Sequence, residues 1–207
     1  MTRSIHRRGY RVELRPPRSS DADEYIRLNR QSRTFYVGLA SPPYTHTEYR
    51  QLLAQAGQPA FAPFLIYLRE DAASIGGVEL SQIVRGKFHS AYLGYQIGAP
   101  FARRGYMGEA LRLLLSNGFD EFKLHRVEAN VQPENAASIR LLRRLGFARE
   151  GFSRRYLKIG GRWRDHERWA ILAEDWCASH SVHEGKGPNK ALQMTARWLV
   201  IRKSVES

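Results

Sequence analysis

The residues with the clearest chemical potential form a short basic turn, in which Arg103, Arg104 and Gly105 come directly before a predicted helix. The first N–H groups of a helix have no backbone partner, and the helix dipole places partial positive charge at the same end. A turn that contains arginine and glycine at this position is therefore well suited to phosphate groups. The pattern predicts a groove for a phosphorylated carrier.

A second set of polar residues follows the next predicted strand. Asn130 lies at the end of this strand, and Asn135 and Ser138 open the helix after it. Asn135 stands three residues before Ser138, which is the spacing at which an asparagine side chain caps a helix. Two interpretations therefore stay open for Asn135 and Ser138: capping of the helix, and contact with a ligand in the same groove.

Three carboxylates on predicted strands are candidates for a general base: Glu79, Glu128 and Asp165. A strand side chain that points into a groove can polarise a water molecule beside an amine. Each also has a structural explanation, since the two glutamates can face solvent or pair with arginines, and Asp165 can hold a hairpin together. For Asp165 we favour the structural role. Cys177 is the single cysteine, which excludes an intramolecular disulfide, and we predict no metal site.

Length and composition indicate one globular domain in a chain of 207 residues, 43% of them hydrophobic. No stretch approaches the ~20 apolar residues of a membrane-spanning helix, and the first residues lack the apolar core of a signal peptide. We therefore expect a cytoplasmic protein. The net charge of +13 predicts attraction to polyanions such as nucleic acid, the ribosome or an acidic membrane surface, while solubility together with an anionic cofactor is the alternative explanation.

Two capping boxes predict the starts of two N-terminal helices. Ser20 with Asp23, and Thr45 with Glu48, have the spacing at which two side chains satisfy each other's backbone N–H groups. Between these helices, residues 35–44 are rich in aromatic side chains and prolines. This segment either lines the mouth of a substrate site or folds back on the core, and the sequence does not separate the two alternatives.

The rest of the chain alternates between strand and helix patterns. Short polar connections join the first strands, which predicts an antiparallel meander. Apolar residues at spacings of three and four then mark two helices, and Gly146 ends the second. The predicted strands cover residues 10–15, 61–68, 75–82, 91–97, 126–131, 152–159 and 162–172, and the predicted helices cover 105–122 and the segment between 135 and 146.

Five segments make the chain similar to a known family. They are residues 84–89 (VRGKFH), 93–98 (LGYQIG), 105–111 (GYMGEAL), 145–147 (LGF) and 163–166 (WRDH). With the order of the elements, they make the chain resemble the GCN5-related N-acetyltransferases (GNAT), in particular the RimJ/RimL-type ribosomal-protein alanine N-acetyltransferases, and RimJ most closely. The resemblance spans one domain at residues 9–177, which leaves an N-terminal extension at 1–8 and a flexible C-terminal tail at 178–207.

The resemblance implies an α/β (α+β) fold of the GNAT type. Its sheet is mixed and mostly antiparallel, has six to seven strands flanked by helices, and splays after Ile97 at a groove for acetyl-CoA. The family's phosphate turn usually reads Gln/Arg-x-x-Gly-x-Gly/Ala, from which Ala102 and Met107 depart. Binding is still expected, because such a turn works largely through backbone N–H groups. The residues implied to contact acetyl-CoA are Tyr95, Gln96, Ile97, Arg103, Arg104, Gly105, Tyr106, Met107, Gly108, Asn130, Asn135 and Ser138.

The resemblance also implies a set of catalytic residues. Many members carry a tyrosine that protonates the departing thiolate, and this chain has a leucine there. Ser138 is the candidate donor instead, with water as the alternative. A strand N–H near Gln96 or Ile97 is expected to stabilise the oxyanion. Glu79 and Asp165 are the candidate bases, although an α-amino group, with a reference pKa of about 7.7 to 8.0, is partly neutral without one.

The function implied by the resemblance is transfer of the acetyl group of acetyl-CoA to the N-terminal α-amine of a ribosomal protein, on alanine or serine, by direct attack on the thioester. Two alternatives stay open. One is acetylation of a small amine such as an antibiotic or a polyamine, which the positive net charge disfavours for a cationic substrate. The other is a ribosome-assembly module in which catalysis is secondary or lost. Contact with the ribosome or rRNA through the basic surface fits either ribosomal hypothesis, and the sequence leaves the oligomeric state open.

Overall fold

The computed structural model describes residues 7–180, and within that range eight strands form one sheet. The strands are β1 (Arg7–Arg8), β2 (Val12–Arg15), β3 (Ala62–Leu68), β4 (Ser74–Val84), β5 (Ser90–Ile97), β6 (Arg126–Val131), β7 (Ala148–Ile159) and β8 (Arg162–Leu172). The helices are α1 (Ala22–Gln31), α2 (His46–Ala56), α3 (Tyr106–Asp120), α4 (Ala136–Arg144) and α5 (Ala173–His180), with short 3-10 turns at Ser19–Asp21 and Ala99–Phe101. The predicted strands and helices are thus present, with shifts of a few residues at their ends.

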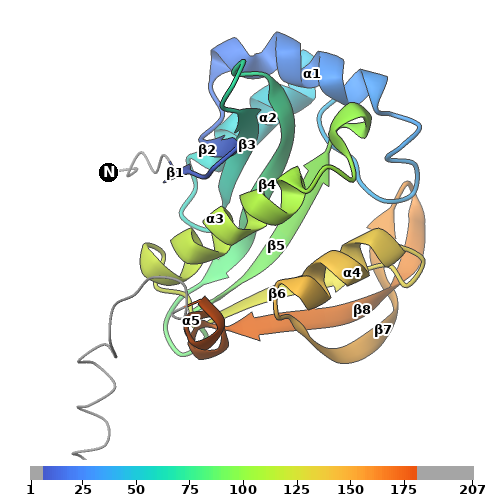
Figure 1. Ribbon diagram of the computed structural model, residues 1–207. Helices are drawn as coiled ribbons and strands as arrows, with labels where there is room; N and C mark the ends of the chain where they lie inside the picture. The colour runs from blue at the N-terminus through green and yellow to red at the C-terminus, as the bar shows by residue number, and fades with distance from the viewer. Residues whose placement is uncertain (1–6, 181–207) are drawn as a thin grey trace, which may run out of the picture. The chain divides into compact units, whose positions relative to one another are not determined.

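The sheet has the strand order β1-β2-β3-β4-β5-β6-β8-β7 (Figure 1). Strands β1 to β5 pair antiparallel in sequence, β5 and β6 pair parallel, and β8 returns antiparallel between β6 and the edge strand β7. A parallel pair needs a crossover, and α3 provides it. The predicted mixed, mostly antiparallel fold is confirmed. The strand that exceeds the predicted six to seven is β1, which consists of two residues and lies within the predicted N-terminal extension.

The sheet opens between β5 and β6. The two strands pair over three residues each, which ends at Tyr92 opposite Glu128. From Leu93 onward β5 pairs with β4 alone, whereas β6 remains paired with β8 along its whole length and therefore diverges with that strand. The expectation that the sheet splays after Ile97 is wrong in position, because the separation begins at Leu93, inside β5.

The two faces of the sheet carry different helices. On one face, α1 and α2 contribute Tyr25, Ile26 and Tyr49 to a buried cluster with Leu65 and Tyr67 of β3. On the other face lies α3, where Gly118 sits beside side chains of β4 and β6. Figure 1 shows α3 and α4 in front of the sheet and α2 behind it. The opening between β5 and β6 therefore leads from one helical layer to the other.

The two predicted capping boxes have different outcomes. Thr45 starts α2 as expected: its hydroxyl accepts from Glu48 N–H at 3.2 Å, and the Glu48 carboxylate accepts from Thr45 N–H at 2.9 Å. The predicted box at Ser20 is wrong, because Ser20 lies inside the 3-10 turn and α1 begins at Ala22. There the Asp21 carboxylate accepts the N–H of residue 18 at 2.7 Å, so one turn of 3-10 helix delays the α-helix.

The chain divides into two units at Glu174, and the structure describes residues 174–180 of the second unit, which belong to α5. Cys177 is exposed on this helix. The predicted tail lies outside the described residues from position 181, as do residues 1–6 of the predicted N-terminal extension. Among the described helices, none has the length and apolar character needed to cross a membrane.

Candidate active site

Two cavities lie where the sheet opens, one toward each helical layer. The α2-side cavity has a volume of about 700 Å³ and is lined by α2, β4, β5, the end of β6 and the β7–β8 hairpin. The α3-side cavity has a volume of about 670 Å³ and is lined by the N-terminal half of α3, by α4 and by β5. The residues that line both are Leu39, Ala40, Tyr95, Gln96, Asn135 and Ser138. The two cavities therefore share one wall at the gap between β5 and β6.

The α3-side cavity contains the predicted phosphate turn. Gly105 stands at the N-terminus of α3 with φ of +84°, and no side chain caps this end of the helix. Only a residue without a Cβ adopts this conformation at little cost, so the glycine both shapes the turn and leaves it open. The first N–H groups of α3 are thus available to an anion. Of the predicted cofactor contacts in this turn, Arg103, Gly105, Tyr106, Met107 and Gly108 line the cavity.

The charge in the α3-side cavity has one sign. Its lining includes the five arginines Arg11, Arg103, Arg112, Arg140 and Arg144, and no aspartate or glutamate. Arg104, a predicted contact, does not line the cavity; its carbonyl oxygen instead accepts from the Arg11 guanidinium at 3.1 Å. A cavity with this charge attracts an anionic ligand.

Strand β5 presents a free edge to the gap. Gly98 N–H donates to the Ile75 carbonyl at 2.8 Å, which fixes the hydrogen-bonding phase of the β4–β5 ladder. Since antiparallel residues alternate, the backbone of Gln96 faces β4, whereas that of Tyr95 and Ile97 faces the gap. The Gln96 side chain is also engaged, as its amide donates to the Tyr25 hydroxyl of α1. Of the two predicted oxyanion donors, Ile97 has the suitable direction and Gln96 does not.

Tyr95 places a hydroxyl group at the shared wall. This oxygen is buried and has no hydrogen-bond partner among the described residues. Burial raises the pKa of Tyr95 to about 12, and hydrogen bonding with the Ser138 side chain acts in the opposite direction. Ser138 is thus the polar group beside this oxygen, although the pair does not meet the geometry of a hydrogen bond. A buried polar atom without a partner is uncommon in a folded protein and points to a group that binds there.

Helix α4 brings Asn135 and Ser138 to the same wall. The Asn135 side chain accepts from Ser138 N–H at 3.1 Å, so Asn135 caps the helix while it lines both cavities. Ser138 lines both as well, whereas Leu142, one turn later, is fully buried and reaches neither. Asn130 lines the α2-side cavity alone, and its amide oxygen is buried without a partner.

Two carboxylates line the α2-side cavity. Glu79 lies on β4 against Gly94 of β5, where a Cβ would come within 2.8 Å of the Glu79 carboxylate. Burial raises the pKa of Glu79. Glu48 is exposed and accepts from Tyr44 N–H at 2.7 Å and from Thr45 N–H, and these hydrogen bonds lower its pKa. Glu79 is therefore the carboxylate with the higher proton affinity, as a general base near neutral pH requires.

The β7–β8 hairpin supplies a further polar group that sequence reasoning missed. Tyr156 and His166 line the α2-side cavity with their rings 6.2 Å apart, and the Tyr156 hydroxyl interacts with Tyr92 of β5. A register shift in β7 lies around Tyr156, and the Asp165 carboxylate accepts from Arg155 N–H at 2.7 Å within it. The sequence feature that could have identified this wall is the segment 163–166. The sequence alone favours a role for this segment in holding the hairpin together, not in lining a cavity.

The remaining candidate bases lie elsewhere. Asp165 lines neither cavity. Glu128 also lies outside both, and its carboxylate pairs with the Arg126 guanidinium at 2.9 Å. Glu79 is thus the predicted base that the fold brings to the gap. Over residues 7–180, no group of three or more histidine, cysteine or acidic side chains is arranged to hold a metal ion.

Comparison with known proteins agrees with this geometry. A family model described as "Acetyltransferase (GNAT) domain" matches residues 11–148. The chain is 36% identical over 179 residues to the probable N-acetyltransferase YjcK of Bacillus subtilis, which covers 81% of this chain and 97% of that protein. It is 41% identical over 113 residues to the [ribosomal protein uS5]-alanine N-acetyltransferase of Escherichia coli, which covers 55% of this chain and 58% of that enzyme.

The fold of the chain is also similar to that of a solved structure. Mycobacterium smegmatis RimJ, in complex with CoA-disulfide, superimposes with a TM-score of 0.71 at 29% identity, and the match covers 81% of this chain and 88% of that one. The open sheet, the glycine-containing turn before α3 and the sequence match lead to one conclusion. The chain belongs to the GNAT family of acetyltransferases.

Proposed function

We propose that this acetyltransferase moves the acetyl group of acetyl-CoA to the N-terminal α-amine of a ribosomal protein, at alanine or serine. The observation that carries the proposal is the pair of cavities of opposite charge that share a wall. A donor and an acceptor that enter from opposite faces of the sheet meet at the gap between β5 and β6. The name of the Escherichia coli relative supports the ribosomal acceptor, and the CoA-disulfide in the Mycobacterium smegmatis structure supports the donor.

The α3-side cavity fits acetyl-CoA, which supplies an acetyl group activated as a thioester. Its arginines and the N-terminus of α3 suit the phosphate groups, and the open edge of β5 offers the backbone of Tyr95 and Ile97 to the amides of the pantetheine arm. The unpartnered Tyr95 hydroxyl lies at the far end of this path, beside Ser138. These residues hold and orient the donor, and orientation is itself a large part of catalysis.

The catalytic roles follow from the direction of each group at the gap. Glu79 accepts the proton of the α-ammonium group, directly or through a water molecule, and the freed nitrogen lone pair forms the new bond to the acetyl carbon. Ile97 N–H stabilises the negative charge on the carbonyl oxygen. As the carbon–sulfur bond breaks, the Ser138 hydroxyl donates a proton to the sulfur. The hydroxyl group regains one through water from the acylated nitrogen, which must lose its second proton to become a neutral amide. A raised pKa at Glu79 matches its proton affinity to this task.

The α2-side cavity suits a cationic acceptor. Glu48 and Glu79 line it without any lysine or arginine. An α-amino group has a reference pKa of about 7.7 to 8.0, against about 10.4 for lysine, so it yields its proton to a glutamate more readily. The proposed acceptor is therefore a protein N-terminus rather than a lysine side chain.

The purified chain tests the proposal with acetyl-CoA and three acceptors. These are a peptide with free N-terminal alanine, the same peptide with a blocked N-terminus and an internal lysine, and spermidine. We expect acetylation of the first alone, measured by mass spectrometry, and a matching shift of 42 Da, about one acetyl group, on a ribosomal protein when cells with and without the chain are compared. Transfer to spermidine alone would favour the small-amine alternative. No transfer to any acceptor with CoA bound would favour the assembly module.

A further inference from the structure

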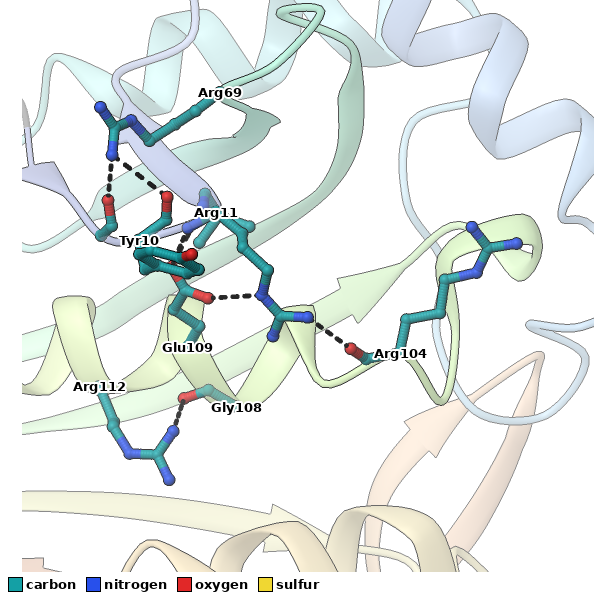
Figure 2. A network of polar contacts seen from close by, with 9 residues as sticks. Tyr10, Arg11, Arg69, Arg104, Gly108, Glu109 and Arg112 are labelled. Carbon is teal, nitrogen blue, oxygen red and sulfur yellow. Dashed lines mark hydrogen bonds and ion pairs between the residues drawn. The ribbon is translucent and has the colours of Figure 1, made fainter.

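Arg11 is a cavity residue that comes from a distant part of the chain. It lies in the bend between β1 and β2, more than 90 positions before the phosphate turn, yet it lines the α3-side cavity. Figure 2 shows its side chain extended between Glu109 of α3 and the backbone of Arg104. None of the sequence motifs includes Arg11, so its presence in the cavity is a result of the fold.

The Arg11 side chain is held from three sides. Its Nε donates to the Glu109 carboxylate at 3.2 Å, and its Nη1 donates to the Arg104 carbonyl at 3.1 Å. The guanidinium carbon also lies 4.8 Å from the centre of the Tyr106 ring. Glu109 is itself fixed, because its other oxygen accepts from Arg11 N–H at 2.6 Å and from Val12 N–H at 3.2 Å. A guanidinium in these contacts has little rotational freedom left to lose on binding a ligand.

The remaining nitrogen of Arg11 points at the phosphate turn. A Cβ placed on Gly105 would lie 3.2 Å from Arg11 Nη2, so this nitrogen stands directly beside the glycine. A guanidinium has five N–H groups, and the two hydrogen bonds above use two of them. The N–H groups of Nη2 are therefore directed to the place where the N-terminus of α3 opens into the cavity.

We propose that Arg11 binds the pyrophosphate of acetyl-CoA, with Nη2 as the donor and Glu109 as the residue that positions it. This inference rests on the proposed function, since it takes acetyl-CoA as the ligand of the α3-side cavity. Arg11, in the bend between β1 and β2, would supply the polar side chain that the turn lacks at Ala102. It also gives the bend a role in donor binding, so that a segment outside the phosphate motif controls affinity.

The neighbouring Arg69 provides a matched control. Its Nη1 donates to the carbonyls of Gly9 at 2.9 Å and Tyr10 at 3.2 Å, so it stabilises the same bend from the other side (Figure 2). Arg69 does not line the α3-side cavity. A purely structural role for Arg11 would give the two arginines the same phenotype, whereas a phosphate contact would separate them.

Calorimetric titration of the full chain with CoA tests the proposal without any need for turnover. For Arg11→Met we expect a Kd about tenfold higher or more, as for loss of a charge-assisted hydrogen bond, and a weaker dependence of Kd on salt. Arg11→Lys keeps the positive charge but loses the planar set of guanidinium N–H donors, so it should give a smaller increase in Kd. Arg69→Met should lower the melting temperature while Kd stays within about twofold, since it loses no ligand contact.

A second donor removes the phosphate groups from the experiment. S-acetylpantetheine has no pyrophosphate, so the rate of transfer from it should be equal in the wild-type protein and Arg11→Met. Equal Kd values for CoA in Arg11→Met and Arg69→Met would overturn the proposal and leave Arg11 a structural tie. If Arg11→Met does not fold, Arg11→Lys decides between the same outcomes. Failure of the wild-type protein to bind CoA would instead remove the proposed function, and this inference with it.

Discussion

The two cavities differ in charge and in the way the chain builds them. The α3-side cavity carries five arginines and no carboxylate, and its central feature is a turn of consecutive residues. The α2-side cavity carries two carboxylates and no lysine or arginine, and its polar side chains come from elements far apart in the chain. The cavities thus have opposite charge on the two sides of one gap. Local charge, rather than the net charge of +13, therefore decides which kind of ligand each cavity attracts.

The charge that lines the α2-side cavity is opposite in sign to the net charge of the chain. The positive net charge disfavoured a cationic acceptor, but the α2-side cavity presents Glu48 and Glu79 to whatever enters it. A field inside a partly enclosed site depends mainly on the charges that line it, because exposed charges farther than the Debye length are screened by salt. Substitutions in the two cavities should therefore affect different constants.

The largest expected effect belongs to Glu79→Gln. Loss of a general base lowers a rate by about 100-fold or more, so kcat should fall by that factor while the Kd for CoA stays unchanged. Steady-state kinetics with a peptide acceptor and titration with CoA measure the two quantities. A CoA affinity that falls with kcat would mean that the two cavities do not act separately.

The second effect concerns the phosphate turn. Gly105→Ala combines a positive φ with a Cβ 3.2 Å from Arg11 Nη2, and it should raise the Kd for CoA by about tenfold through strain and a displaced donor. Gly86→Ala is the control, because Gly86 has a similar φ of +71° and no atom within 4 Å of the added Cβ. Equal effects of the two variants on CoA binding would remove the turn from the site.

A smaller effect is expected for Ser138→Ala at the shared wall. If the hydroxyl protonates the departing thiolate, kcat should fall by about tenfold, since water replaces the donor in part, while CoA affinity changes less. Equal losses in kcat and affinity would assign Ser138 to binding alone. Loss of neither would leave it with a structural role in α4, whose start is capped through its backbone N–H.

The smallest effect is on stability, and it has opposite signs for the two carboxylates. Burial raises the pKa of Glu79, so its contribution to stability is lost as pH rises from the usual glutamate range through the raised pKa. Glu79→Gln should therefore raise the free energy of unfolding at neutral pH by about 1.4 kcal/mol per unit of pKa displacement, and with it the melting temperature, and the gain should vanish below about pH 4.

Glu48→Gln is the matched control, because backbone hydrogen bonds lower the pKa of Glu48. Its stabilisation is present above the usual glutamate pKa and disappears as pH falls. This variant should lower the melting temperature at neutral pH. Thermal unfolding from pH 4 to pH 8 measures both variants, and changes of the same sign would contradict the assignment of the two environments.

The sequence predicted the α3-side cavity far better than the α2-side cavity, for a physical reason. The turn at Gly105 and the cap at Asn135 each depend on residues within one helical turn, so their spacing is visible in the chain. The group of Tyr92, Tyr156 and His166 depends on the pairing of β8 with β6 and on the register shift in β7, and no local pattern encodes these. Long-range pairing is what sequence patterns describe least well.

The errors at element ends have the same origin. The divergence of β5 and β6 from Leu93 is set by β8, which holds β6 along its whole length, so β5 alone gave no sign of it. The 3-10 turn that displaces Ser20 from the cap of α1 is again a matter of how the preceding chain enters the helix. Arg11 shows the same dependence, because its approach to Gly105 relies on Glu109, 98 positions away.

The wall common to both cavities has a thermodynamic consequence. Tyr95, Gln96, Asn135 and Ser138 line both cavities, so in the proposed reaction a ligand on one side contacts groups that the ligand on the other side also uses. If a bound donor changes the affinity for the amine by some factor, a bound amine changes the affinity for the donor by the same factor. A dissociation constant measured for either ligand alone therefore does not report the coupling between the two substrates. The coupling is obtained by comparing that constant with the one measured when the other substrate is already bound.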